Sequence, residues 1–433
     1  MDTTMSTRDL RKSNLVPMAL VASMFFILGF ATWLNGSLMP YLKQVLQLTP
    51  LQASLILFSF YIAVTFTAIP SAWVIRKVGY KTGMALAIGG MMVAGLLYIP
   101  AAKTQTFELF LFAQLVMGIA QTLLQTAVNP YVVRLGPEES AAVRVSIMGI
   151  LNKGAGIVAP LVFSALIASN FTGLVGKELS QDEIDLMANS LILPYLGLAG
   201  FLALFALGIK FSPLPEIREE GEKDAGGSVK EALAHPNLVL GVIAIFFYVA
   251  AEVIAGDTIG AFALSLGVVN YSVMTSYTMA CMVAGYILGI VLIPRVISQQ
   301  TALTASAVLG MLLSLFIVFG DASSSVLADT LLVPFGGVSL PDTLLAIAVL
   351  GLANAIVWPA VWPLALSGLG RLTSTASGLL VMGIAGGAFG PLFWGLASGA
   401  GDAGSQQFGY IVLLPCYAYI LYFALIGHKK KSW

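Results

Sequence analysis

Residues 237–265 read NLVLGVIAIFFYVAAEVIAGDTIGAFALS, an apolar run interrupted by two charged residues, Glu252 and Asp257. A helix needs about 20 apolar residues to cross the hydrocarbon core of a bilayer, so this run is long enough to span it. A charge near the bilayer centre costs roughly 2.5–3.5 kcal/mol on insertion scales and marks a functional site by default. The stretch therefore predicts a transmembrane helix that carries functional acids.

Long apolar runs of the same kind recur along the whole chain. The other candidate spans are 15–38, 51–75, 82–102, 107–133, 142–169, 189–211, 274–294, 301–320, 343–367, 373–399 and 407–427. The first of them is too long for the apolar core of a signal peptide, so we expect it to be retained. We predict an all-α membrane protein with twelve transmembrane helices in two six-helix bundles. The expected parts are an N-terminal bundle at 1–211, a cytoplasmic linker at 212–236 and a C-terminal bundle at 237–433.

The composition supports this class and excludes several others. Of the 433 residues, 58% are hydrophobic and 10% are charged, whereas a soluble domain usually has about 25% charged residues. Lysine and arginine balance aspartate and glutamate at 21 each, so no basic field attracts nucleic acid. With only two histidines and two cysteines in the chain, no zinc cluster is indicated. The chain has no phosphate-binding Gly-x-x-x-x-Gly-Lys-Ser/Thr loop, and we expect no metal and no cofactor.

The basic residues orient the predicted spans. With both termini in the cytoplasm, seventeen of the 21 lysines and arginines fall in cytoplasmic segments. Only Lys43, Lys103 and Lys177 fall on the opposite side, and Lys153 falls inside a span. Because cytoplasmic loops carry the excess of basic residues, this asymmetry supports an even number of spans with both termini cytoplasmic.

The two halves also share short sequence patterns. Met148-Gly149-Ile150 precedes Pro160-Leu161 in the fifth span, and Met382-Gly383-Ile384 precedes Pro391-Leu392 in the eleventh. Equivalent places in both halves favour an internal duplication, as in transporters built from two repeated bundles.

Three charged residues lie well inside the predicted spans: Lys153, Glu252 and Asp257. Measured from the starts of their spans, Lys153 and Glu252 differ by about four residues, or roughly 6 Å of helical rise. Depth therefore favours Glu252 as the partner of Lys153, with Asp257 left spare. In an ideal helix the two acids point about 140° apart, although Gly256 and Gly260 can alter this. Either these charges form a structural ion pair with Lys153, or the acids are carboxylates that titrate or bind a cation.

Neutral polar residues form stripes on two other spans. Gln114, Gln121 and Gln125 share one helical face with Asn129 about a turn beyond. Asn354 and two tryptophans, Trp358 and Trp362, repeat every four residues. Aromatic faces beside amides suit a sugar, which has apolar C–H faces and a polar rim. The alternative is hydrogen bonding between helices with interfacial tryptophan anchors, and we prefer that alternative for Gln114.

Several motifs resemble the fucose/glucose/galactose symporter family of the major facilitator superfamily. They are Leu34-Asn35 before Leu38-Met39-Pro40, Asn129-Pro130, the run from Tyr248 to Val253, and Gly368-Leu369-Gly370 with Thr373-Ser374 and Ser377-Gly378. The resemblance runs along nearly the whole chain. It implies two six-helix bundles around a central cavity that carry a monosaccharide with a cation across the bacterial inner membrane.

The chain departs from that family at the positions that concern coupling. The family's proton-coupled fucose carriers have an acid after Leu-Asn in span one and another in span four, and Gly36 and Gln125 stand there. The family's Asn-Ser pattern reads Asn152-Lys153, and Arg76 replaces the usual aspartate of the basic loop. Coupling therefore falls to Glu252 and Asp257.

These observations together define the candidate site. The candidate sugar-binding residues are Asn35, Gln121, Gln125, Asn129, Asn152, Asn354 and Trp358, and the candidate coupling residues are Glu252, Asp257 and Lys153. Protons can use either acid, sodium can bind Asp257 with amide or backbone oxygens, or Lys153 can act as a permanent internal cation in a facilitator. We prefer symport, with the proton ahead of sodium.

The expected function is import of a hexose such as glucose, galactose or mannose by a monomer in the lipid bilayer. A drug or metabolite exporter of the same superfamily is the alternative transporter. A membrane-embedded hydrolase lacks support, because the predicted spans hold no histidine and no convincing catalytic pair. We therefore expect no enzymatic activity. A sugar sensor without transport is a further alternative, but the short loops and the absence of an attached signalling domain count against it.

Overall fold

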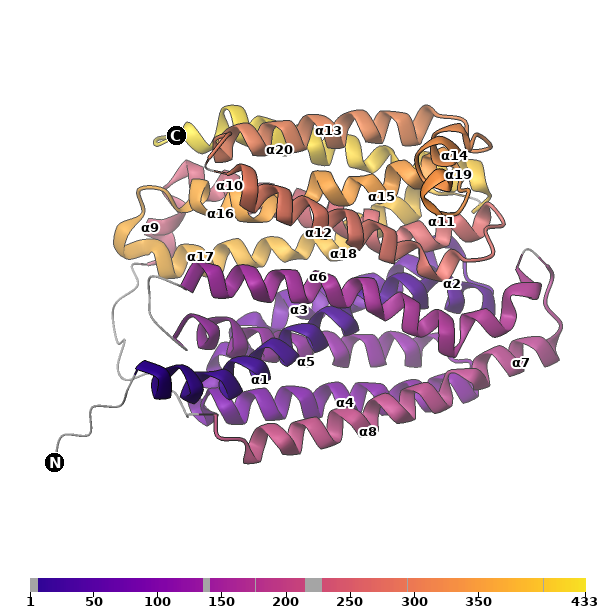
Figure 1. Cartoon of the computed structure of the whole chain (residues 1–433), viewed down its shortest axis with the longest axis horizontal. Coiled ribbons are helices and arrows are strands. Elements are labelled where there is room, and N and C mark those ends of the chain that lie inside the picture. Colours follow the sequence, from indigo (N-terminus) through magenta and orange to yellow (C-terminus); the bar gives the residue numbers. More distant parts are fainter. Residues whose placement is uncertain (1–6, 135–140, 176, 215–227, 294, 400) are drawn as a thin grey trace.

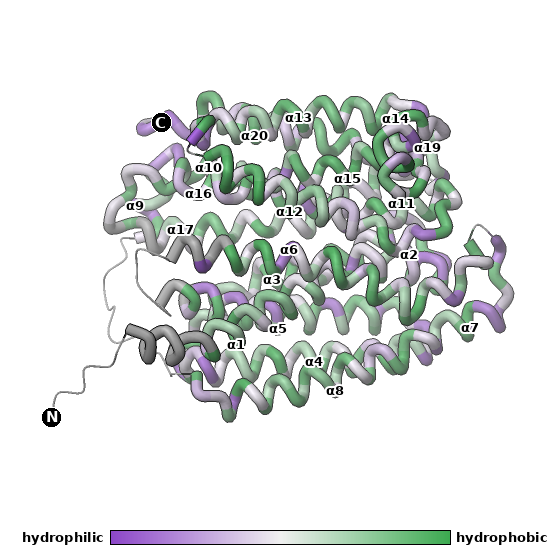
Figure 2. Tube along the Cα trace, viewed as in Figure 1, coloured by the Kyte–Doolittle hydropathy of each residue, from purple (hydrophilic) through white to green (hydrophobic). Residues whose placement is uncertain are grey.

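The computed structural model describes residues 7–134, 141–175, 177–214, 228–293, 295–399 and 401–433, and every regular element in these ranges is helical. Within these ranges, twelve helical segments are long and apolar enough to cross a membrane, as the sequence predicted. The start of α1 and the end of the chain lie at one end of the molecule, here called the terminal end (Figure 1). The opposite end is called the far end. Hydrophobic residues cover the spans and hydrophilic ones gather mainly at the two ends (Figure 2).

The first six spans follow one another along the chain. They are α1 (Thr7–Trp33) with α2 (Asn35–Val45), α3 (Pro50–Val78), α4 (Tyr80–Thr104), α5 (Phe107–Arg134), α6 (Ala141–Leu166), and α7 (Gln181–Ser190) with α8 (Ile192–Phe211). Local sequence explains where some of them begin. Thr49 and Gln52 form a capping box at the start of α3, and Pro50 occupies the first helical position, where its missing N–H is not needed.

The last six spans contain more breaks. They are α10 (Pro236–Val253) with a π-helical turn (Ile254–Thr258) and α11 (Ile259–Ser265), α12 (Met274–Leu292), α13 (Gln299–Phe319), α15 (Asp342–Ala355) with α16 (Val357–Leu366), α17 (Thr373–Met382) with α18 (Gly386–Ala397), and α19 (Ala403–Gly409) with α20 (Leu413–Leu425). Two short helices, α9 (Val229–Leu233) and α14 (Val326–Leu331), lie between spans.

The spans pack into two sets. In the first set α3 and α4 pack on α5, α4 packs on α8 and α1 packs on α6; in the second, α12 packs on α15, α13 on α20 and α10 on α18. The main contacts between the sets are α3 with α18 and α6 with α12. If the second half repeats the first, spans two and five correspond to spans eight and eleven. The two contacts are then equivalent, which agrees with the duplication expected from sequence.

The division of the chain at 212–236 stays a prediction. Residues 215–227 of the expected linker lie outside the described residues. On either side of them the chain is described, with α8 ending at Phe211 and α9 beginning at Val229.

Three spans are interrupted beside residues that the sequence singled out. Span one breaks at Leu34, next to Asn35, and span ten breaks at Ile356, between Asn354 and Trp358. Span seven contains the π-helical turn that holds Asp257. Discontinuous helices near the middle of the membrane and π turns are both associated with binding sites, because they free or redirect backbone groups.

Candidate transport site

Lys153 on α6 forms an ion pair with Glu252 on α10, so the pair joins the two sets of spans. The exposed fractions of the two side chains are 12% and 10%. The Lys153 Nζ also lies 4.4 Å from the ring centroid of Trp33. A carboxylate and an aromatic face both compensate a cation removed from water. The depth argument predicted this pairing, and the structure shows it.

Asp257 is fully buried in the π-helical turn. Its Oδ2 accepts a long hydrogen bond of 3.4 Å from the Tyr61 hydroxyl on α3. Its Oδ1 meets no donor in hydrogen-bonding geometry among the described residues, although it faces the backbone of Gly36. A buried carboxyl group with an unused oxygen is costly, so it is a candidate for a proton or a cation.

The α-helix of span seven does not continue unbroken from Glu252 to Asp257, so the 140° separation expected for an ideal α-helix does not apply. A π turn closes with i→i+5 hydrogen bonds, which brings residues five apart toward the same face. Asp257 lies within this turn and Glu252 just before it, and they contact the first set of spans through Tyr61 and Lys153 respectively. The sequence indicated that Gly256 could disturb the helix, but it did not indicate the kind of turn.

Side-chain hydrogen bonds connect the two sets toward the far end. The Ser37 hydroxyl donates to the Ser272 carbonyl, and the Gln44 amide donates to the Tyr271 hydroxyl at 2.9 Å. The backbones also approach closely, since a β-carbon on Gly260 would lie 2.8 Å from the Gly36 carbonyl oxygen. The far end is therefore closed where α2 meets α11.

Three of the candidate amides are buried and half satisfied. Asn354 accepts from the Tyr417 hydroxyl at 2.9 Å, and Gln121 accepts from Thr32 at 2.8 Å. Asn35 accepts from an amide on α5 at 2.7 Å. In each case the amide nitrogen lacks a partner among the described residues. These N–H groups are free to donate to a ligand or a water.

The donor to Asn35 is Gln114, which is buried. This hydrogen bond joins span four to span one. The preferred interpretation of Gln114, a hydrogen bond between helices, is therefore confirmed.

The remaining candidates lie in less buried positions. The Asn152 amide donates to the Phe25 carbonyl at 3.3 Å, and Gln125 is half-buried. Asn129 is exposed. Trp358 is half-buried and packs against Tyr248, with ring centroids 6.1 Å apart.

Sequence reasoning missed four side chains at this site. Tyr248 faces the Glu252 carboxylate, and Trp33 and Tyr61 contact Lys153 and Asp257. Thr275 donates to the Gly256 carbonyl at 2.7 Å. Each lies in an apolar run, where aromatic residues and threonines are common. The only signal in the sequence was that a hydroxyl or an indole N–H inside a transmembrane span needs a hydrogen-bond partner.

Two sets of six spans that meet around a buried ion pair, with broken helices near the middle, define a protein of the secondary-transporter class. The chain belongs to the Major Facilitator Superfamily, whose sequence profile matches residues 21–399. This confirms the resemblance seen in the sequence.

Relatives match along almost the whole chain. The chain is 33% identical to a glucose/galactose transporter of Brucella abortus, covering 94% of this chain and 93% of the relative. It is 28% identical to the L-fucose-proton symporter of Escherichia coli, covering 95% and 93%. Among solved structures, it is similar to the transporter FucP in the outward conformation, with a TM-score of 0.65, 26% identity and coverage of 95% and 98%.

Proposed function

We propose that the chain is a secondary active transporter that imports a hexose such as glucose, galactose or mannose by cation symport, with the proton preferred to sodium. The names of its relatives support a sugar as the substrate. The observation that carries coupling is Asp257, a fully buried carboxyl group at the contact between the two sets of spans.

Asp257 couples a cation to alternating access through hydration. In the closed far end it is covered by Gly36 and Tyr61, and a neutral acid is far cheaper to bury than a carboxylate. When α2 separates from α11, water reaches the carboxyl group and protons exchange with the far side. Protonation then allows the far end to close again. The reverse exchange occurs when the terminal end admits water.

The Lys153–Glu252 pair has a different role. Because Glu252 neutralises Lys153 locally, the pair supplies no net internal cation, which argues against the facilitator alternative. The pair holds the two sets together close to Asp257. Sodium remains an alternative at Asp257, because the Gly256 carbonyl and the Thr275 hydroxyl place oxygen atoms beside it.

The sugar is proposed to bind next to this pair. Tyr248 and Trp358 offer aromatic faces to its C–H groups. The unpaired amide N–H groups of Asn35, Gln121 and Asn354 are donors for its hydroxyls. Gln125, Asn129 and Asn152 complete the proposed set.

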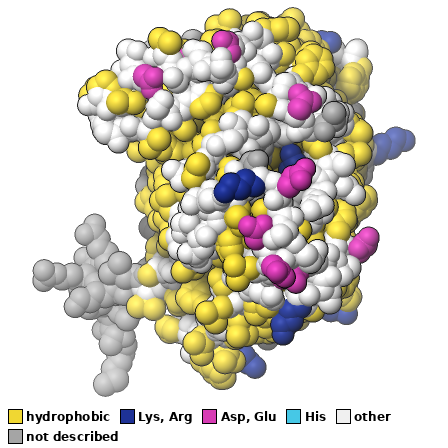
Figure 3. All heavy atoms as spheres, turned by 90° about the vertical axis from the view of Figure 1, so that its right-hand side faces the viewer, with side chains coloured by type: hydrophobic (Ala, Val, Ile, Leu, Met, Phe, Trp, Pro, Cys, Tyr) yellow, Lys and Arg dark blue, Asp and Glu magenta, His cyan; other side chains and the backbone are white. Residues whose placement is uncertain are grey.

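The proposed orientation places both termini in the cytoplasm of a bacterium, with a monomer in the inner membrane. The distribution of lysine and arginine supports it. Acidic side chains spread over the far end (Figure 3), and the exposed ones include Glu178, Asp182, Asp321, Asp329 and Asp402. The far end then faces the outside, and the structure is closed to the outside.

Uptake into proteoliposomes tests the proposed function. Labelled glucose, galactose and mannose are offered with an imposed proton gradient, an imposed sodium gradient, or neither. We expect accumulation of at least one hexose with the proton gradient. No accumulation of any hexose under either gradient would contradict the proposal. Accumulation under the sodium gradient alone would identify sodium, and not the proton, as the coupling ion.

Asp257→Asn tests the coupling group in the same assay. We expect gradient-driven accumulation to be lost while sugar exchange partly survives, because asparagine cannot carry the proton. Asp185→Asn, which changes an exposed acid at the far end, is the matched control and should behave as wild type. Normal accumulation by Asp257→Asn would exclude this acid as the coupling group.

A further inference from the structure

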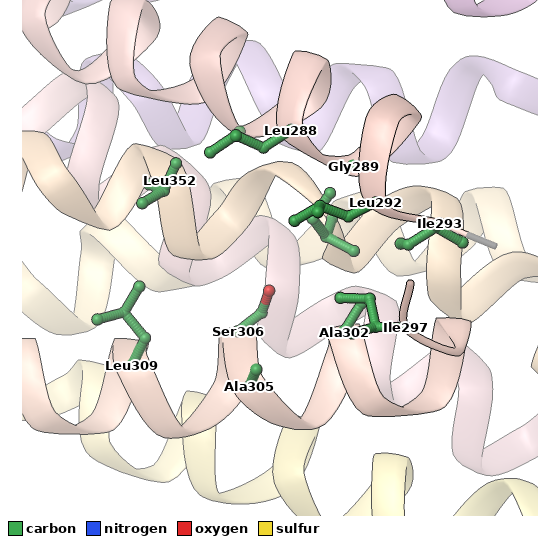
Figure 4. Close-up of a pocket in the computed structure, with 12 residues that line it drawn as sticks. Leu288, Gly289, Leu292, Ile293, Ile297, Ala302, Ala305, Ser306, Leu309 and Leu352 are labelled. Carbon is green, nitrogen blue, oxygen red and sulfur yellow. The ribbon is translucent and has the colours of Figure 1, made fainter. Parts of the chain in front are cut away.

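A cleft of about 160 Å³ lies between α12, α13 and α15 (Figure 4), and none of the proposed sugar-binding residues lines it. Its walls are mostly apolar side chains, among them Leu288, Leu292, Ile297 and Leu309. Among its lining residues, Ser306 provides the single hydroxyl group. An apolar cleft of this kind binds a hydrocarbon group rather than a sugar or an ion.

The cleft continues the lipid-facing surface of the protein. Leu288 on α12 is 48% exposed, and Ala305 on α13 is also exposed. Neighbouring apolar residues outside the cleft, such as Val291 and Leu312, are exposed as well. In a twelve-span membrane protein such apolar surface faces the acyl chains of the bilayer, so lipid reaches the cleft directly.

An exposed basic residue lies close in the chain to residues that line the cleft. Arg295 is exposed and lies in the connection from α12 to α13, between Ile293 and Ile297, which both line the cleft. Basic groups beside apolar clefts between membrane helices attract anionic lipid head groups. The apolar cleft and the charge together match the two parts of an acidic phospholipid.

We propose that this cleft binds an acyl chain of an anionic phospholipid from the leaflet at the terminal end, with the head group at Arg295. An engineered cavity of about 150 Å³ binds benzene, so the cleft accommodates a segment of about six carbons. The rest of the chain lies along the lipid-facing surface beside Leu288.

The inner wall of the cleft connects the lipid to the proposed sugar site. Leu352 and Ile356 line the cleft, and Ile356 is the break of span ten between Asn354 and Trp358. An acyl chain behind this break supports the geometry that presents these two residues. This second part rests on the proposed function, whereas lipid binding does not.

Native mass spectrometry of the purified full chain tests the binding. Phosphatidylglycerol and phosphatidylethanolamine are added separately to delipidated protein. We expect a preference for phosphatidylglycerol that Arg295→Gln reduces by about fivefold, the factor for one basic residue near an anionic head group. Lys210→Gln removes another exposed basic residue and should leave the preference unchanged.

Filling the cleft is the second arm of the test. Ala305→Phe places a ring in the cleft from an exposed position, and Leu312→Phe places one on the same face of α13 outside it. We expect only Ala305→Phe to remove the bound lipid. Equal lipid retention by both variants, or an unchanged preference in Arg295→Gln, would overturn the site.

Uptake measurements distinguish a failure of the lipid site from a failure of the proposed function. We expect wild-type hexose uptake to rise severalfold when phosphatidylglycerol is included in the proteoliposomes, and Ala305→Phe to lose this response. If lipid binds but uptake does not respond to it, only the proposed link to span ten is overturned, and the lipid site stands. Absence of uptake in any lipid counts against the proposed function and leaves the binding result valid.

Discussion

At the residue scale, the Lys153–Glu252 pair decides how charge is tolerated inside the membrane. Both side chains are nearly buried, and they contact each other across the two sets of spans. Removal of one partner leaves an uncompensated buried charge, whereas removal of both leaves none. The pair is therefore expected to behave as a unit in mutants.

Thermal unfolding in detergent checks this expectation. Lys153→Met alone should destabilise the protein by roughly 3 kcal/mol, the lower end of the cost of breaking a buried ion pair. The double variant Lys153→Met/Glu252→Gln should recover most of that loss. If the double variant is as unstable as the single one, the two residues do not act as a pair.

At the element scale, α2 approaches α11 and α12 closely at the far end, and we propose that this contact acts as the gate there. A β-carbon on Gly36 would lie 2.1 Å from the Thr275 Oγ1 and 3.1 Å from the Asp257 Oδ1. Glycine is needed here because backbones of neighbouring helices approach closely only without side chains between them. Loss of this fit should hold the far end apart.

Gly36→Ala therefore should abolish concentrative uptake while the protein still folds and inserts. Cysteine labelling at the far end should increase in the same variant, because that end stays open. Gly154→Ala is the control, since nothing lies within 4 Å of the β-carbon it would add. Wild-type uptake by Gly36→Ala would show that the contact is not part of the gate.

At the scale of the whole molecule, the lysines and arginines give the twelve spans one preferred orientation. The start of α1 and the C-terminus share one end (Figure 1), and acidic side chains spread over the other (Figure 3). The positive-inside rule therefore predicts that the terminal end lies in the cytoplasm.

Fusions to the C-terminus test that orientation. A green fluorescent protein fused after Trp433 should fluoresce, and an alkaline phosphatase fused there should be inactive, because the first matures in the cytoplasm and the second outside it. A fusion of each reporter within the far-end loop between α13 and α15 should give the opposite pattern. Active phosphatase at Trp433 would invert the proposed direction of transport.

The sequence by itself determined the twelve spans, the three charged residues inside them and the family. These properties are local, because bilayer thickness selects runs of about 20 apolar residues and each buried charge is visible as an exception. Depth in the membrane also predicted the partner of Lys153. The two spans cross the membrane in the same direction, so the depths of their residues can be compared by counting from the start of each span.

Only the tertiary structure decided what lies beside what. Tyr61 on Asp257, the closure of α2 on α11, and the hydrogen bond from Gln114 to Asn35 depend on how helices rotate and pack laterally. The π turn that holds Asp257 was likewise not indicated by the sequence. Hydropathy indicates which residues lie in the membrane but not which helices lie side by side. The direction of each polar side chain is therefore known only once the packing of neighbouring helices is known.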